Sequence, residues 1–166
     1  MIRPAEPEDA AAIRAVHEAA FPTPLEADLV EALVREGDAI VSLVAVRQGE
    51  LVGHVLLSRM AVTGDGRALR ALGLAPVGIL PGFQGAGVGG ALIEAAVAVA
   101  RASGEELVFL LGEPAYYERF GFSAATAAPF ASPYAGPYFM ALALQPGFVS
   151  PASGSAAYAR AFSDLA

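Results

Sequence analysis

The sequence predicts a mixed α+β domain in which a mostly antiparallel sheet is flanked by helices. Three observations predict it. Two segments with helical periodicity open the chain, β-rich runs separated by turn residues follow, and a glycine-rich loop then enters a third helix. A chain of 166 residues can bury a core of its own. No segment has the character of a linker, so we expect one domain over residues 1–166.

The first part of the chain predicts two helices and two long strands. Residues 1–4 fit a short strand, and apolar residues at helical spacing predict helices over about 8–20 and 24–36. Two β-rich runs follow at 39–46 and 51–62. The turn residues RQGE separate these runs, and TGDG follows the second, so antiparallel hairpins are expected.

The middle of the chain predicts a buried strand that leads into the glycine loop. Residues 68–80 are apolar almost throughout, which is typical of a central strand. Pro76 lies inside this run and cannot donate a ladder hydrogen bond, so its pairing should be interrupted nearby. The remaining predicted elements are a helix over 88–103, a strand over 106–111, a single-turn helix over 113–119, and strands over 138–144 and 156–162.

The composition raises the question of a membrane span. The hydrophobic fraction is 55% and the mean hydropathy is +0.53. Glycine and proline interrupt both long uncharged runs, 71–93 and 120–159, so neither gives the roughly 20 apolar residues that a spanning helix needs. The N-terminus lacks the apolar region of a secretory signal. We therefore expect a cytoplasmic protein with no membrane partner.

Composition also excludes several kinds of chemistry. There is no cysteine, which rules out disulfides and a cysteine nucleophile. His17 and His54 stand at no recognisable metal-ligand spacing, so no metal is expected. The net charge is −7 and the ten basic residues, all arginine, form no basic stripe. A nucleic-acid partner is therefore not expected.

The loop Gln84–Gly90, with sequence QGAGVGG, is the segment most indicative of function. Small residues at the start of a helix allow several backbone N–H groups to point at one place, and the helix dipole favours negative charge there. A phosphate group is the expected ligand. A nucleoside-triphosphate loop requires a lysine to reach the terminal phosphates, and this chain contains none.

A dinucleotide fold of the Rossmann type is a remote alternative. Gly85, Gly87 and Gly90 spell GxGxxG, and Glu113 could serve as the ribose-binding acid of an NAD(P) site. That fingerprint should open the first βαβ unit, whereas here several predicted elements precede it. Only 53 residues follow Glu113, too few to complete a doubly wound sheet.

The segment LAPVGILPGFQGAGVGGALIEAA resembles the acyl-CoA motif of the GNAT (GCN5-related) N-acetyltransferase superfamily. Gln84, Gly87 and Gly89 fall on its defining positions. After the next predicted strand, AYYERFGF is similar to a second family motif, a tyrosine followed four residues later by Gly-Phe, here Tyr117 and Gly121-Phe122. The resemblance covers roughly residues 1–144 and is strongest to small bacterial members whose substrates are mostly unassigned.

The resemblance implies the acyl-CoA N-acyltransferase fold, with a mixed sheet splayed at its centre, and acetyl-CoA as cosubstrate. The pantetheine arm would lie along Ile79 and Leu80. Arg119 would either reach a CoA phosphate or lie on a solvated helix face. A homodimer formed through late strands is also expected from the resemblance. The cofactor-binding residues that it implies around the pyrophosphate are Gln84, Gly85, Ala86, Gly87, Val88, Gly89 and Gly90.

The implied reaction is direct acetyl transfer to a primary amine, on a small molecule or a protein, in a ternary complex. A main-chain N–H near Ile79 or Leu80 would stabilise the thioester oxygen. Tyr117 would protonate the leaving thiolate, unless it only packs in the core. The group that takes the amine proton stays open between His54, Glu26 and a chain of water molecules. A CoA-binding module without catalysis is the competing hypothesis.

Three further residues are expected to be structural. His17 is interpreted as a surface or packing residue of the first helix, and Glu105 and Glu106 as a solvated turn after the third helix.

Overall fold

The computed structural model describes residues 1–165, which form two compact units. The first unit comprises residues 1–58, 75–96 and the chain from 160 onward, and the second comprises 59–74 and 97–159. The expectation of one domain over the whole chain stays a prediction. Each unit is described by itself.

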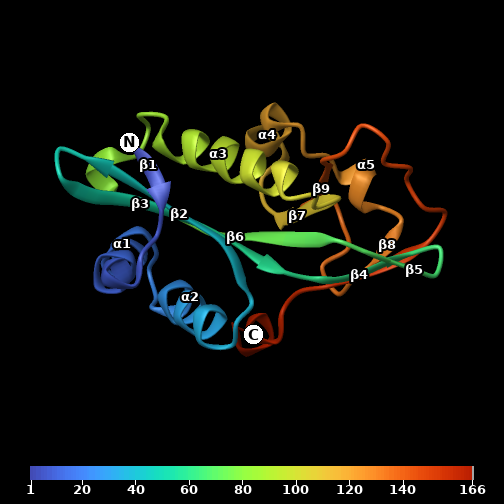
Figure 1. The fold of residues 1–166 in the computed structure, drawn as a ribbon, viewed down its shortest axis with the longest axis horizontal. Coiled ribbons are helices and arrows are strands. Elements are labelled where there is room, and N and C mark those ends of the chain that lie inside the picture. The colour runs from blue at the N-terminus through green and yellow to red at the C-terminus, as the bar shows by residue number, and fades with distance from the viewer. Residues whose placement is uncertain (166) are drawn as a thin grey trace. The chain divides into compact units, whose positions relative to one another are not determined.

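The first unit combines an antiparallel sheet with helices on both of its faces. β1 pairs with β2 and β2 with β3, both antiparallel, and β6 follows β3 in the strand order. In Figure 1, α1 and α2 lie together on one face of β2 and β3, and the beginning of α3 lies on the other. Its elements are β1 (Ile2–Pro4), η1 (Pro7–Asp9), α1 (Ala10–Ala20), α2 (Leu25–Arg35), β2 (Ala39–Arg47), β3 (Glu50–Arg59), β6 (Ala71–Ile79), η2 (Pro81–Phe83), α3 (Val88–Ala102) and η4 (Arg160–Leu165).

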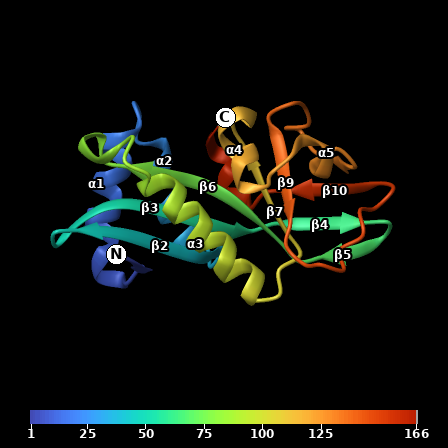
Figure 2. The same ribbon diagram turned by 90° about the horizontal axis from the view of Figure 1, so that it is seen from above.

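The second unit contains the far ends of β3, β6 and α3 and two groups of strands. β6 runs parallel to β7, whose other edge pairs antiparallel with β9. A four-stranded sheet has the order β5-β4-β10-β8, and Figure 2 shows β10, β4 and β5 side by side. Its elements are β4 (Ala61–Gly64), β5 (Arg67–Leu69), β7 (Leu107–Leu111), α4 (Pro114–Tyr117), η3 (Glu118–Phe120), α5 (Ala124–Ala127), β8 (Phe130–Ala131), β9 (Phe139–Ala143) and β10 (Gly154–Ala157).

Apolar periodicity explains which faces of these elements are buried. Ile13, Val16 and His17 of α1 are buried, and the core of the second unit includes the stacked rings of Phe109 and Phe139, 5.3 Å apart. Among residues 1–165, no helix has both the length and the apolar character to span a bilayer.

The predicted mixed fold with a mostly antiparallel sheet is confirmed, and two long strands are shorter than expected. The run 51–62 divides at Met60 into β3 and β4, and the run 68–80 divides at Arg70 into β5 and β6. In both cases one residue between the strands moves the chain from one sheet to the other. The sequence does not mark such a change, because strand-forming residues continue on either side of it.

The prediction of a strand over 156–162 is wrong in its second half. β10 ends at Ala157, and η4 occupies the chain from Arg160. Two elements, α5 and β8, were not predicted, and they are four and two residues long. Elements of this length carry no periodicity that could identify them.

The predicted interruption at Pro76 is confirmed. The parallel register of β6 with β7 covers Ala71–Gly73 and ends before Pro76. On its other edge, β6 stays connected to β3, since the amide of Leu80 just beyond it donates to the carbonyl of Val52.

Candidate functional site

The loop between β6 and α3 has a backbone that favours glycine at two positions. Gly85 and Gly87 have φ angles of 79° and 84°, in the left-handed region, and both are exposed. No atom lies within 4 Å of the place that a Cβ would occupy at either residue. The backbone of this loop is therefore open to a ligand.

The amides at the start of α3 supply donors to the same place. The amide of Ala91 bonds to the carbonyl of Gly87 at 3.0 Å. Because α3 begins at Val88, the amides of Val88, Gly89 and Gly90 have no acceptor within the helix. Together with the helix dipole, they form a site suited to an anion.

Gln84 connects the loop to the strand that precedes it. Its Nε2 donates to the carbonyl of Ile79 at 2.9 Å. Val88, at the other end of the loop, is buried and lies on the face of β3 at Gly53. The open backbone of Gly85, Ala86 and Gly87 is thus held between two fixed points.

The structure distinguishes the two predicted oxyanion donors. The Leu80 amide donates to the carbonyl of Val52 at 2.8 Å and is already occupied. Successive amides of a strand point to opposite edges, so the amide of Ile79 points away from β3. Of the two, Ile79 has the amide suited to an incoming carbonyl oxygen.

Opposite faces of β6 meet different helices. A Cβ at Gly78 would lie 2.6 Å from Nδ1 of His17, on the side of α1. The Ile79 side chain lies on the other face, where its Cδ1 would be 2.8 Å from a Cβ at Gly53 on β3. His17 and α3 therefore lie on opposite faces of β6.

His54 and His17 form a buried pair, each with 0% exposure. His54 Nδ1 lies 2.8 Å from His17 Nε2, and His54 Nε2 lies 2.8 Å from Oγ of Ser42. Burial lowers the pKa of His54 to about 3, with a further decrease from His17, and lowers the pKa of His17 to about 4. Both rings are neutral at pH 7.

These contacts change the interpretation of both histidines. A surface position for His17 is wrong, and packing is right, since its ring also stacks on Phe21 at 5.9 Å. Its position four residues after Ile13, on the apolar face of α1, was the available signal.

Both ring nitrogens of His54 have hydrogen-bond partners. The role of His54 as a base stays a prediction. Ser42 was missed, because a single serine in a strand carries no signal.

Glu26 lies in the first turn of α2 and is half-buried. Its Oε1 is buried and has no hydrogen-bond partner among residues 1–165. An unsatisfied carboxylate oxygen is costly to bury, and an ammonium group is a suitable partner for it.

Tyr117 belongs to the second unit, on α4. Its half-buried ring has edge contacts with Tyr116 and Phe122 at 4.9 and 6.2 Å between centroids. Burial, with a smaller contribution from Tyr116, raises the pKa of Tyr117 above its ordinary value of 10. The phenol therefore keeps its proton at neutral pH.

Arg119 follows on η3 and is exposed. Its guanidinium lies over the ring of Tyr116, 4.2 Å from the centroid, and 5.2 Å from that of Phe120. These cation–π contacts orient the group while leaving it exposed to a phosphate.

The interpretation of Glu105 as part of a solvated turn is wrong. Its side chain is 1% exposed, and its carboxylate accepts from Arg59 at 2.7 Å and from Arg70 at 2.7 Å. Glu106 is partly covered and accepts from the Arg70 amide at 2.9 Å. In residues 1–165, no group of three or more histidines and carboxylates is arranged to hold a metal ion.

The chain is similar to known acetyltransferases. The acetyltransferase (GNAT) domain family matches residues 1–125. The chain is 40% identical to the uncharacterized N-acetyltransferase YjhQ of Escherichia coli K12, over 69% of this chain and 64% of YjhQ. It therefore matches less than two thirds of the length of that relative. It is 33% identical to YhbS of the same organism, over 75% of this chain and 74% of YhbS.

Two solved structures cover almost the whole chain. A GNAT family acetyltransferase from Brucella melitensis in complex with acetyl-CoA has a TM-score of 0.78 and 36% identity, over 98% of this chain and 97% of its own. YhbS from Escherichia coli in complex with CoA has a TM-score of 0.86 and 29% identity, over 98% and 91%.

Proposed function

The chain belongs to the GNAT acetyltransferase family, and we propose that it transfers an acetyl group from acetyl-CoA directly to a primary amine in a ternary complex. The observation that carries the proposal is the open backbone of Gly85 and Gly87, both with left-handed φ, just before the first amides of α3. A diphosphate matches this array of amides. The solved relatives that bind acetyl-CoA and CoA support the same cosubstrate.

The acyl group would lie beside the end of β6. The amide of Ile79 would donate to the thioester oxygen, where negative charge develops when the amine attacks. The Leu80 amide would not take this role, because it donates to Val52. Its bond would instead fix the strand end, so that the Ile79 donor is held in place before the substrate arrives.

Tyr117 would act as the general acid. The amine nitrogen bonds to the thioester carbon, the C–S bond breaks, and the leaving thiolate takes the phenolic proton. The leaving thiolate, whose conjugate acid has a pKa near 8.5, is a weaker base than the Tyr117 phenolate, so the transfer is completed when the phenolate takes a proton back from water. The raised pKa of Tyr117 ensures that the proton is present.

The acceptor would be recognised as a cation before it loses a proton. The buried Oε1 of Glu26 needs a partner, and an ammonium group would satisfy it. The net charge of −7 favours the approach of a cationic amine. His54, or a route that includes it, would take the proton that the ammonium must lose.

A panel of amines tests the proposal. Wild-type protein is mixed with acetyl-CoA and separately with a dipeptide N-terminus, a lysine peptide, spermidine or an aminoglycoside, and thiol release is measured. Acceleration above water by at least one amine is expected. Tight CoA binding in calorimetry without acceleration by any amine would instead indicate a binding module. Binding of NAD(P) without CoA binding would point to the dinucleotide alternative.

A further inference from the structure

Three side chains from different elements form one continuous hydrogen-bonded chain. Ser42 on β2, His54 on β3 and His17 on α1 are joined by contacts of 2.8 Å each. Every ring nitrogen except His17 Nδ1 has a partner in this chain, and Nδ1 is buried without one among residues 1–165. A buried nitrogen without a partner is costly. We call His17 Nδ1 the inner end of this hydrogen-bonded chain and the Ser42 hydroxyl its outer end.

The inner end of the hydrogen-bonded chain lies against β6. His17 Nδ1 faces Gly78, where a Cβ would come to 2.6 Å from it. A glycine therefore lets the imidazole approach the strand backbone. The next residue is Ile79, whose amide is the proposed oxyanion donor. The imidazole thus lies one residue along the strand from the place where the acyl carbon would be attacked.

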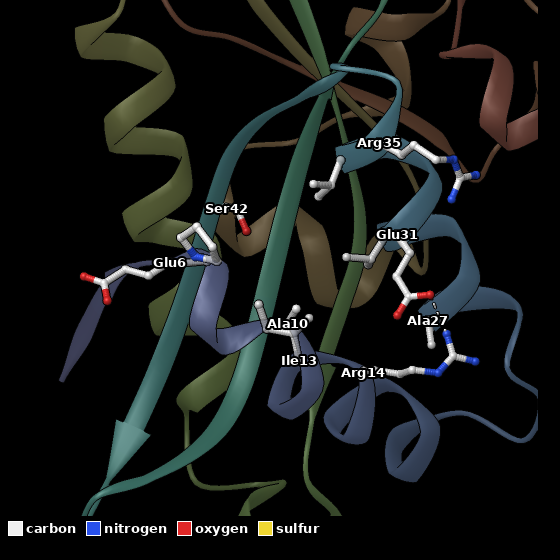
Figure 3. Close-up of a pocket in the computed structure, with 12 residues that line it drawn as sticks. Glu6, Ala10, Ile13, Arg14, Ala27, Glu31, Arg35 and Ser42 are labelled. Atoms are coloured by element: carbon white, nitrogen blue, oxygen red, sulfur yellow. Dashed lines mark hydrogen bonds and ion pairs between the residues drawn. The ribbon is translucent and has the colours of Figure 1, made fainter.

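The outer end of the hydrogen-bonded chain, the Ser42 hydroxyl, opens into a pocket. Ser42 is half-buried and lines a cavity of about 450 Å³ enclosed by η1, α1, α2 and β2. In Figure 3, Ile13, Ala10 and Ala27 point into this space, and Arg14 contacts Glu31 beside it. The Ser42 hydroxyl is thus a polar group on an otherwise largely apolar wall.

We propose that His17, His54 and Ser42 form a proton relay that removes the proton of the acceptor ammonium and carries it from β6 to the pocket at Ser42. The proposal rests on the proposed acetyl transfer and names the route by which its acceptor is deprotonated. It assigns His17 the first position, His54 the middle and Ser42 the outlet.

The relay uses the tautomer in which Nε2 of each histidine carries the hydrogen before the reaction, which is compatible with both contacts. The ammonium N–H bond breaks and a proton bonds to Nδ1 of His17. The proton on Nε2 of His17 passes to Nδ1 of His54, the proton on Nε2 of His54 passes to Oγ of Ser42, and the hydroxyl proton of Ser42 passes to water. The transfers reverse as the product leaves, while the Phe21 ring is still displaced and the inner end can give its proton to solvent.

The neutral state of both imidazole rings suits a proton relay. Burial makes a charged imidazolium unfavourable at either ring. A concerted shift changes only which nitrogen of each ring carries the hydrogen, so no charge accumulates. The carboxylate of Asp9, at the start of α1, opposes part of the decrease in the pKa of His54. Arg3 pairs with Asp9 at 2.8 Å.

The ring of Phe21 covers the inner end. The ring of Phe21, half-buried at the end of α1, stacks on His17 and lies 3.5 Å from the Cβ position of Gly78. The relay therefore requires this ring to shift when an acceptor binds. Catalytic contacts commonly tighten only in the substrate complex.

The test uses the full chain, acetyl-CoA and the amine from the panel that the wild type acetylates fastest. The variants are H17Q, H54Q and S42A, because glutamine keeps hydrogen bonds but does not relay a proton. The matched control is S58A, which removes a buried hydroxyl without a partner on the same strand as His54. Melting temperature and acetyl-CoA affinity are measured for each variant.

The expected losses in kcat/KM at pH 7 are about a hundredfold for H17Q and H54Q and about tenfold for S42A, with S58A unchanged. Each loss should shrink by about tenfold per pH unit as the pH rises toward the pKa of the amine, because the amine then arrives neutral. A purely structural role would give a loss that does not recover with pH.

Wild-type kcat/KM in folded H17Q and H54Q, or a loss independent of pH, overturns the relay while leaving acetyl transfer intact. If the histidine variants do not fold, S42A decides, and unchanged kcat/KM in S42A overturns the relay. A wild type that binds CoA and acetylates no amine overturns the proposed function and the relay together.

Discussion

The ring of Tyr117 packs directly on the backbone of Gly112. A methyl group at Gly112 would overlap Cδ2 and Cε2 of the ring. The absence of a side chain at Gly112 therefore helps to set the place of the phenol on α4. This packing gives Tyr117 a structural role in addition to its proposed role as general acid, and the two can be separated experimentally.

Replacing Tyr117 with phenylalanine should lower kcat by about 10²-fold or more, because the thiolate loses its proton donor. The affinity for acetyl-CoA should change little, since the ring stays in place. Steady-state kinetics and calorimetry measure the two effects. Tyr116→Phe is the matched control on the same turn. Equal rates for Tyr117→Phe and wild type would show that another group protonates the thiolate.

Replacing Gly87 with alanine should weaken CoA binding by about tenfold or more. Its φ of 84° costs an alanine roughly 1–2 kcal/mol, and the methyl group would stand at the open backbone of the loop. Gly82→Ala is the control, because Gly82 lies in the same connection with free space and no left-handed φ. Titration calorimetry with CoA compares the two. Similar affinities would contradict the placement of the diphosphate.

Replacing Glu105 with glutamine should destabilise the protein by about 2 kcal/mol, because the ion pairs to Arg59 and Arg70 are lost at a buried position. Glu36→Gln is the control. Its partner Arg160 is 84% exposed, so the expected effect is below about 1 kcal/mol. Urea unfolding measures both. A larger effect at Glu36 would refute the assignment of Glu105 to the core.

Stability should fall as the pH drops from about 6.5 toward 4. The folded pKa values of His17 and His54, about 4 and about 3, lie below the ordinary 6.5. The unfolded chain therefore binds protons in this window that the folded protein does not, which costs up to roughly 1.4 kcal/mol per pH unit for each histidine. Urea midpoints across this range measure the slope.

The double variant H17Q/H54Q should flatten this slope, because it removes both titrating rings. The urea midpoint of the double variant near pH 4 should be close to the midpoint of the same variant at pH 7. A wild-type stability that stays constant between pH 6.5 and 4 would mean that the two rings are not buried as a neutral pair.

Much of the local structure was predictable because it depends on neighbouring residues. Helical spacing located α1 and α2, and the glycines from Gly85 onward located the start of α3. Pro76 located the end of pairing between β6 and β7, since a proline lacks the donor wherever the chain places it. The change of sheet at Met60 was not predictable, because strand-forming residues continue on both sides of it.

The candidate site divides in the same way. By itself, the sequence determined the glycine-rich loop before α3 and the lack of lysine and cysteine, because these follow from which side chains are missing. Tertiary structure alone decided that the Leu80 amide is occupied by Val52, that Glu105 is buried between two arginines, and that His17 meets His54. Each of these contacts joins residues at least 28 positions apart, and their pairing depends on how the strands and helices pack.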